Sequence, residues 1–265
     1  MVGGLTIAVT GKGGVGKTFV SALLVRLFSK VGSVLAIDGD ADSNLPNALG
    51  VTISKTIGDT REEILNTPAR SAKGKRKQES LALAAHEAIE EFPNFDLYVM
   101  GRPEGQGCYC PVNYIVRQVL DSRARGYDFT VVDCDAGMEH LSRYTTRDVD
   151  IMLIVAEPTK NAIETAARIR DLAQELQIEF EAIMLVANKV TEQTQPLITS
   201  MAQQNDLQIA AFVPYDPLVG QFDIEGKSVM DFPEDSPAFI AVNELCQKIL
   251  DYRETGSHPA VASSE

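Results

Sequence analysis

The sequence predicts an α/β fold in which helices cover both faces of a mostly parallel, twisted sheet. Apolar runs of strand length alternate with helix-like segments along most of the 265 residues. A glycine-rich segment of the kind that cradles phosphate joins the first apolar run to the first helical segment. With 45% hydrophobic residues, a chain of this length can enclose a sizeable core. The predicted fold class is therefore that of a P-loop nucleoside triphosphatase.

The predicted elements follow one another without a linker or an internal repeat. Seven apolar runs are predicted to be strands: Leu5–Val9, Val34–Ile37, Phe95–Met100, Phe129–Val132, Ile151–Ala156, Ala182–Val186 and Ile209–Val213. The predicted helices are Phe19–Lys30, Val112–Arg125, Ile163–Leu176, Gln193–Gln204 and Pro237–Tyr252. Residues 1–252 are accordingly expected to form a single domain. Residues 253–265 lack periodicity and are expected to be a disordered tail.

Charge and composition narrow the classes of partner. Twenty-four basic and 37 acidic residues give a net charge of −13, which argues against nucleic acid or anionic lipid as a partner. We expect neither a signal peptide nor a membrane span. Four cysteines are too few for a disulfide framework in a chain of this length, so we predict a cytoplasmic protein. One basic segment, Arg70–Lys77, departs from this pattern. It is either a solvated loop or a docking site for an acidic partner protein.

The segment Gly11–Thr18 fits the phosphate-binding pattern G-x-x-x-x-G-K-[ST]. Its glycines let successive backbone N–H groups point at one anion, and the start of the following helix adds partial positive charge. Lys17 is expected to reach the outer phosphates, and the Thr18 hydroxyl to ligate magnesium. The remaining residues predicted to contact the nucleotide here are Gly13, Gly14, Val15, Gly16 and Phe19.

Carboxylates crowd the end of the second predicted strand, in Asp38-Gly39-Asp40-Ala41-Asp42. The carboxyl ends of parallel strands face the crevice where ligands bind in such sheets. Like charges are costly there unless they organise a metal ion or a water molecule, and Asp40 is predicted to do so. The alternative is an acidic turn in which Asp42 or Ser43 caps the next helix.

Two further strand ends carry predicted nucleotide contacts. Phe129–Val132 ends in Asp133, which is predicted to join the magnesium shell, while the backbone N–H of Gly137 contacts the terminal phosphate. Asn188 and Lys189 follow another strand, and the Asn188 amide can pair with a purine edge. Thr191 stands where GTPases carry a guanine-binding Asp, so adenine is favoured. Pro214 and Tyr215 are expected to cover the base.

The run Lys-Gly-Gly-Val-Gly-Lys-Thr at Lys12–Thr18 resembles the signature of the deviant Walker A, or MinD-like, ATPases, over roughly residues 4–252. The resemblance implies that Lys12 crosses a two-fold dimer interface to the partner's nucleotide, as an arginine finger does. It also implies that Asp40 is the switch I aspartate that positions the attacking water. Asp133 would then be the Walker B aspartate and Gly137 the switch II glycine. Slow, dimer-dependent ATP hydrolysis with magnesium is therefore expected, with Lys12, Lys17 and Asp40 as catalytic residues.

Within that family the chain is similar to the CooC-type accessory ATPases that insert nickel into carbon monoxide dehydrogenase. The similarity lies in four segments: Gly107-Cys108-Tyr109-Cys110, Asp38-Gly39-Asp40, Gly137–Leu141 and Glu157-Pro158. It implies a nickel or zinc site shared across a homodimer, and a nickel enzyme as client. The related factor for acetyl-CoA synthase shares these features, so both clients stay open.

The cysteine pair has a simpler interpretation, in which both are buried and act as small apolar residues. Pro111 favours a helix start, and thiols near a helix N-terminus have a lowered pKa, which favours metal binding by Cys108 and Cys110. Cys134 and Cys246 are expected to pack in the core. Three other functions remain as alternatives: a membrane-positioning ATPase, a DNA-partitioning ATPase, and an iron–sulfur ATPase of the nitrogenase-reductase type that uses Cys108 and Cys134.

Overall fold

The computed structural model describes residues 4–59, 88–101, 126–135, 149–175 and 180–256. Its strands are β1 Leu5–Gly11, β2 Val34–Asp38, β3 Ile89–Glu91, β4 Asp96–Val99, β5 Phe129–Asp133, β6 Ile151–Ala156, β7 Ala182–Val190 and β8 Ile209–Pro214. Its α-helices are α1 Lys17–Phe28, α2 Leu45–Leu49, α7 Lys160–Glu175, α8 Gln195–Gln204, α9 Pro217–Glu225 and α10 Pro237–Thr255, with a 3₁₀ turn, η2, at Val229–Asp231. The predicted alternation of strands and helices is confirmed in these ranges.

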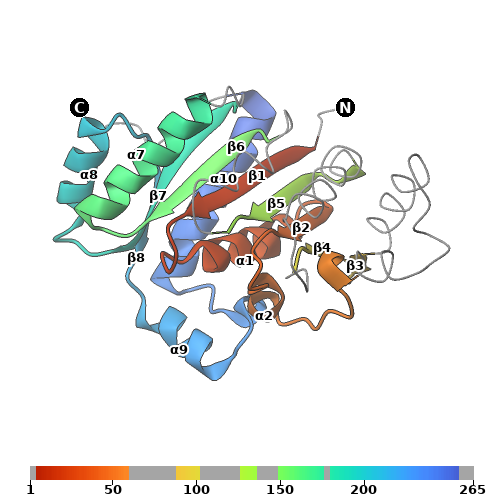
Figure 1. The fold of residues 1–265 in the computed structure, drawn as a ribbon. Coiled ribbons are helices and arrows are strands. Elements are labelled where there is room, and N and C mark those ends of the chain that lie inside the picture. Colours follow the sequence, from red (N-terminus) through yellow and green to blue (C-terminus); the bar gives the residue numbers. More distant parts are fainter. Residues whose placement is uncertain (1–3, 60–87, 102–125, 136–148, 176–179, 257–265) are drawn as a thin grey trace.

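The eight strands form one sheet in the order β3-β4-β2-β5-β1-β6-β7-β8 (Figure 1). All neighbours run parallel except β3, which pairs antiparallel with β4 at one edge. β1 lies between β5 and β6, so the glycine-rich loop that follows β1 emerges near the middle of the sheet. In a parallel sheet all carboxyl ends meet at one edge, and this edge carries the predicted site.

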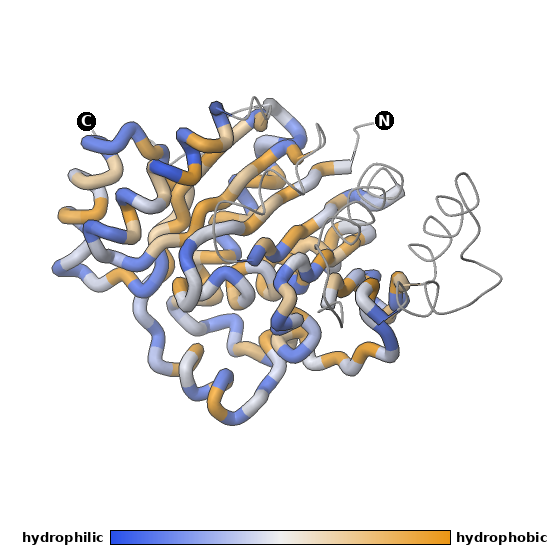
Figure 2. The backbone as a smooth tube through the Cα atoms, viewed as in Figure 1, coloured by the Kyte–Doolittle hydropathy of each residue, from blue (hydrophilic) through white to orange (hydrophobic). Residues whose placement is uncertain are grey.

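Helices cover both faces of the sheet, as predicted. On one face, α1 and α10 pack against the strands in the largest apolar cluster, where the rings of Phe28 and Phe129 stack with centroids 4.4 Å apart. On the other face, α7 and α8 cover β6 and β7 in a separate cluster. Figure 2 shows hydrophobic residues concentrated along the strands of the sheet. The fold class is therefore confirmed.

Among the elements whose bounds the structure describes, four short ones escaped prediction: α2, β3, α9 and η2. The helix α2 has five residues and β3 has three, too few for either hydrophobic periodicity to show. No residue of α9 is fully buried, and Leu218, Val219 and Phe222 are only partly buried against the core, so its nine residues carry a weak helical pattern. The predicted helix Val112–Arg125 lies outside the described residues.

The final helix extends past the predicted boundary at Tyr252 and ends at Thr255. Its last turn is held in place because Arg253 lies 3.2 Å from Asp128 and stacks 4.5 Å above the Phe129 ring. Tyr252 also donates a hydrogen bond to Glu181. Residues 253–255 therefore belong to the domain, a correction to the predicted tail, and residues 257–265 lie outside the described ranges. In the described part of the chain, no helix has the length and apolar character needed to cross a membrane.

Candidate functional site

The loop between β1 and α1 has the backbone geometry of an anion cradle. Gly11 ends β1 and α1 begins at Lys17, with Gly16 as its N-cap in a left-handed conformation at φ 93°. No side chain caps this helix start, so its first N–H groups are free to meet an anion. A Cβ atom on Gly16 would lie 2.4 Å from the Asn188 amide nitrogen, so only glycine fits here.

The two lysines of the loop have different environments. Lys17 is buried, and its Nζ donates a 3.3 Å hydrogen bond to the Lys12 carbonyl. Burial raises the pKa of the nearby Asp133 carboxyl, and the charge of Lys17 offsets part of that rise. The side chain of Lys12 is exposed, as a residue that reaches a second subunit would have to be. The loop therefore carries one buried lysine, Lys17, at the predicted phosphate site, and one solvent-exposed lysine, Lys12.

Asp133, at the end of β5, is fully enclosed beneath the start of α1. Ser21 donates to its Oδ1 at 3.0 Å, and the Thr18 hydroxyl also donates to the carboxylate. Burial raises the pKa of Asp133 from its usual 3.8 to about 6, although both hydroxyls and Lys17 act in the opposite direction. Asp133 and Thr18 are therefore brought together, as predicted for neighbours in a magnesium shell.

Asp38 ends β2, directly beside Asp133 in the strand register. Its two oxygens accept hydrogen bonds from the backbone N–H groups of Asp40 at 3.0 Å and of Leu45 at 2.9 Å. Burial, followed by the charge of Asp133, raises the pKa of Asp38 to about 8. The side chain of Asp38 therefore orients the loop that carries Asp40 and also bonds to the first residue of α2.

The alternative role for the acidic segment, helix capping by Asp42 or Ser43, is not what the structure shows. The residue that precedes α2 is Asn44, and its side chain makes no capping hydrogen bond. Asp38 supplies the bond to the helix start from seven residues away. Asp40 is partly exposed and accepts a hydrogen bond from the Asp42 N–H at 2.9 Å. The Asp40 carboxylate is close enough to Asp133 to interact with it electrostatically, and its partial exposure lets it contact water or a ligand.

These side chains fit a magnesium ion. Magnesium prefers hard oxygen ligands and is usually held by one or two carboxylates together with phosphate oxygens and water. Asp133 and Asp38 lie side by side and raise each other's cost of ionisation, a repulsion that a divalent cation would relieve. The Thr18 hydroxyl and Asp40 supply further oxygens. Within the described ranges no three His, Cys, Asp or Glu side chains form a metal cluster by themselves, so phosphate and water would have to complete the shell.

The end of β7 contacts the outer side of the glycine loop. The buried Asn188 amide donates to the Val15 carbonyl at 2.8 Å, and its oxygen accepts from the Lys189 N–H at 2.9 Å. Lys189 Nζ donates to the Gly14 carbonyl at 3.0 Å and forms an ion pair with Glu157, the residue that follows β6. Asn188 and Lys189 therefore lie beside the loop and donate to its carbonyls. The predicted pairing of the Asn188 amide with a purine edge stays a prediction.

Two residues are predicted to cover the base. Pro214 ends β8 at the same edge of the sheet, and Tyr215 follows it. The Tyr215 N–H donates to the Val190 carbonyl at 2.8 Å, which fixes its backbone against the end of β7. Its side chain is 60% exposed and so is available to a ligand. The contact with a base stays a prediction.

Three neighbours of the site were not singled out from the sequence as contributors: Ser21, Asp38 and Glu157. Ser21 lies one helical turn after Lys17 and Thr18, so the i, i+3 spacing was the only signal for it. Asp38 and Glu157 follow strands, as the predicted Asp133 does. Predicted residues Gly137, Cys108 and Cys110 lie outside the described residues, as does the basic segment Arg70–Lys77.

The remaining two cysteines are in the core, as predicted. Cys134 and Cys246 are free and buried, and burial raises the pKa of each thiol to about 12. A buried, protonated thiol is a poor metal ligand.

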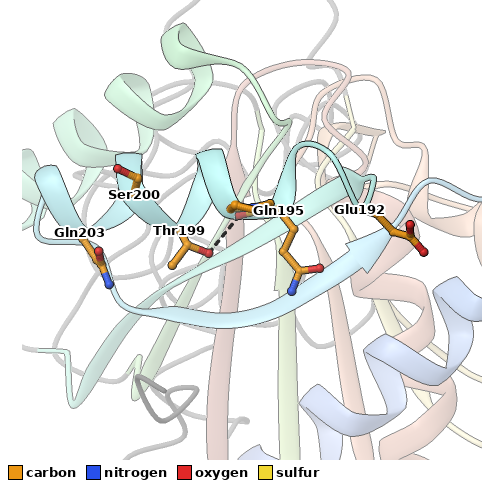
Figure 3. A pocket seen from close by; sticks show the side chains of 6 residues that line it. Glu192, Gln195, Thr199, Ser200 and Gln203 are labelled. Carbon is orange, nitrogen blue, oxygen red and sulfur yellow. Dashed lines mark hydrogen bonds between the residues drawn. The ribbon is translucent and has the colours of Figure 1, made fainter. Parts of the chain in front are cut away.

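A separate hollow of about 470 Å³ lies along α8 (Figure 3). It is lined by polar side chains and one proline: Glu192, Gln195, Pro196, Thr199, Ser200 and Gln203. Thr199 donates to the Gln195 carbonyl at 2.9 Å, a bond internal to the helix. No predicted site residue contributes to this hollow, and the site of interest remains the carboxyl edge of the sheet.

Comparison with known proteins is consistent with this site. The sequence profile of the CobQ/CobB/MinD/ParA nucleotide binding domain matches residues 6–229. An uncharacterized ATP-binding protein of Methanocaldococcus jannaschii is 42% identical over 250 residues, which cover 93% of this chain and 99% of that protein. The carbon monoxide dehydrogenase accessory protein CooC of Rhodospirillum rubrum is 32% identical over 247 residues, 88% of this chain and 91% of CooC. The septum site-determining protein MinD of Pyrococcus horikoshii, solved with Mg-ADP, superposes with a TM-score of 0.70 at 22% identity, covering 95% of this chain and 97% of MinD.

Proposed function

Since the chain belongs to the CobQ/CobB/MinD/ParA family of nucleotide-binding domains, we propose that it is a cytoplasmic ATPase that assists the maturation of a nickel enzyme. The client is carbon monoxide dehydrogenase or acetyl-CoA synthase. The observation that carries this proposal is the 32% identity to CooC along 88% of the chain. The likeness to MinD structures at 22% identity or less concerns the fold alone, so it does not favour a positioning function.

Binding of ATP rests on the geometry of the glycine loop. The N–H groups of the loop and of the α1 start surround the phosphates, and the buried Lys17 neutralises the outer ones. Thr18 and Asp133 are the residues that would hold a magnesium ion, which would supply positive charge to the phosphates. The Gly137 N–H contacts the terminal phosphate. Pro214 and Tyr215 cover an adenine.

Hydrolysis is assigned to Asp40. Its backbone is held by Asp38, which leaves its partly exposed carboxylate to orient the attacking water and to accept a proton from it. Charge that develops on the phosphoryl oxygens is stabilised by Lys17 and, from the other subunit of a homodimer, by the exposed Lys12. Hydrolysis is then slow in the monomer, because one cation of the site arrives only on dimerisation.

Nickel is the cargo of the proposed reaction, bound by Cys108 and Cys110 before transfer to the client. Two thiolates leave a soft divalent ion half-coordinated, whereas a closed thiolate site has four ligands. A two-fold axis between the subunits supplies the second pair, so one ion per dimer is expected. Zinc would accept the same four sulfurs as a tetrahedron, and nickel in a flatter arrangement.

An iron–sulfur ATPase of the nitrogenase-reductase type is the alternative that the cysteines leave open. It requires Cys134 as a cluster ligand, yet that thiol is 4% exposed and its pKa is raised to about 12. These two observations favour nickel at Cys108 and Cys110 over a cluster that involves Cys134.

The proposal is tested by metal analysis of the dimer and its variants. Wild-type protein loaded with Ni²⁺ and freed of excess ion is expected to hold one ion per two chains. The double variant Cys108→Ala, Cys110→Ala should hold none and should fail to activate the client, with ATP binding intact. The matched control is Cys246→Ala, which removes a thiol from the core and should leave the metal content unchanged. One tightly bound ion per chain, or unchanged binding in the double variant, would disprove the shared site.

A further inference from the structure

Lys189 joins the glycine loop to a carboxylate that has no assigned role. Its Nζ donates to the Gly14 carbonyl at 3.0 Å and pairs with Glu157, which follows β6. Among the contacts of the described residues, Glu157 is linked to the loop through Lys189. We propose that Glu157 is a positioning residue for phosphate binding, which holds the Lys189 ammonium against the Gly14 carbonyl. This inference rests on the proposed function, because it concerns how the same loop receives ATP.

The backbone at Lys189 is in a conformation that other contacts have to maintain. Lys189 has φ 57°, in the left-handed region that non-glycine residues rarely adopt, and the pairing of β7 with β8 shifts register between Ala187 and Val190. Such a conformation persists only where surrounding contacts enforce it, and it is common at functional sites. Here the enforcing contacts are the Asn188 oxygen on the Lys189 N–H and the two partners of the ammonium.

The direction of the Gly14 carbonyl decides what the loop offers to an anion. In a loop of successive peptide groups, N–H groups converge on the anion only if the carbonyl oxygens point away from it. The carbonyls of Gly14 and Val15 both accept bonds from the end of β7, through Lys189 and Asn188 respectively. The end of β7 therefore fixes two consecutive carbonyls on the side away from the phosphates.

Glu157 orients the side chain of Lys189. Lys189 and Glu157 side chains are 43% and 35% exposed, so the attraction between them adds little to stability. A lysine side chain alone has many rotamers, and it could equally turn toward the phosphates or into water. The carboxylate from β6 selects the rotamer that contacts Gly14. Its effect is expected on nucleotide affinity more than on folding.

The test measures the dissociation constant of a fluorescent ATP analogue with full-length variants. Lys189→Gln should weaken binding about tenfold, because it removes a charged hydrogen bond to the loop. Glu157→Gln should weaken it about threefold, and should have little further effect in the Lys189→Gln background. Lys189→Arg keeps a donor and should bind within about twofold of wild type. The matched control Glu164→Gln breaks an exposed ion pair with Lys160 on α7 and should leave affinity unchanged.

An exchange of the two charges separates positioning from simple attraction. The double variant Glu157→Lys, Lys189→Glu restores an ion pair but places a carboxylate, which cannot donate, beside the Gly14 carbonyl. We expect a melting temperature close to that of wild type, with ATP affinity reduced about tenfold or more. Affinity restored by the exchange would overturn the proposal, and so would wild-type affinity in Glu157→Gln. Wild-type protein that bound no ATP at all would instead refute the proposed function.

Discussion

The Asn188 side-chain amide connects β7 to the glycine loop, and the effect of removing it can be predicted from its two hydrogen bonds. Asn188→Ala leaves the Val15 carbonyl and the Lys189 N–H without their partners. An unsatisfied buried polar group costs about 1–3 kcal/mol, so the two together should lower the free energy of unfolding by about 3 kcal/mol. For a chain of this size that corresponds to a fall of about 5–10 °C in melting temperature.

Nucleotide affinity should fall in the same variant. Without the amide, the Val15 carbonyl loses its donor and the left-handed backbone of Lys189 loses one of its three enforcing contacts, so the loop loses part of the geometry that aims its N–H groups at phosphate. We expect ATP to bind at least about tenfold more weakly, a loss of about 1.4 kcal/mol. Isothermal titration calorimetry with Mg-ATP gives the affinity, and circular dichroism without nucleotide gives the melting temperature.

Asn205→Ala is the matched control for this prediction. Its amide donates to the Met201 carbonyl at 2.8 Å, a bond of the same kind at the end of α8. Loss of that bond should lower stability by about 1 kcal/mol and leave ATP affinity unchanged. The reasoning fails if Asn188→Ala binds ATP as tightly as wild type, or if its melting temperature falls no further than that of Asn205→Ala.

Three further predictions concern Asp40, Lys12 and Asp38. Asp40→Asn should retain ATP binding and lose at least about 100-fold in turnover, measured as phosphate release, because an amide cannot take a proton from water; turnover at the wild-type rate would contradict this assignment. Lys12→Gln should bind nucleotide but fail to hydrolyse it, and sedimentation analysis with full ATP-dependent dimerisation and full activity would exclude a role across the interface. Burial raises the pKa of Asp38 to about 8, so the folded state retains a proton that the unfolded chain loses above about pH 4. The stability that this carboxyl contributes is present at low pH and is lost as the pH rises toward 8. The melting temperature of magnesium-free protein should therefore fall between about pH 5 and pH 8, and should fall less in Asp38→Asn. An equal fall in both proteins would refute the assignment of this pH dependence to Asp38.

Much of the fold follows from local pattern. Continuous apolar runs such as Ile151–Ala156 are buried along their whole length in the structure, which is why a parallel sheet covered on both faces could be predicted. The glycine loop and the acidic strand ends were found because their chemistry lies within a few residues. Asp133 and Thr18 belong together through the topology, since the register places the end of β5 beside β1.

Contacts between segments that lie far apart in the chain could not be predicted from local sequence patterns. Asn188 and Val15 are 173 positions apart, and only the folded sheet brings the amide to the carbonyl. The left-handed backbone of Lys189 has no sequence signal, because lysine rarely adopts it. Asp38 accepts hydrogen bonds from both the Asp40 N–H and the first residue of α2. Both bonds depend on the shape of the intervening turn, which the sequence does not predict.

The central claim is that the carboxyl edge of this sheet binds ATP through the glycine loop. Calorimetric titration of Mg-ATP into wild-type protein and into Lys17→Ala tests it most directly, because Lys17 is the buried lysine of the loop. We predict one nucleotide bound per wild-type chain and no measurable binding by the folded variant. Equal affinity in the two proteins, or no binding by wild type, would contradict the claim.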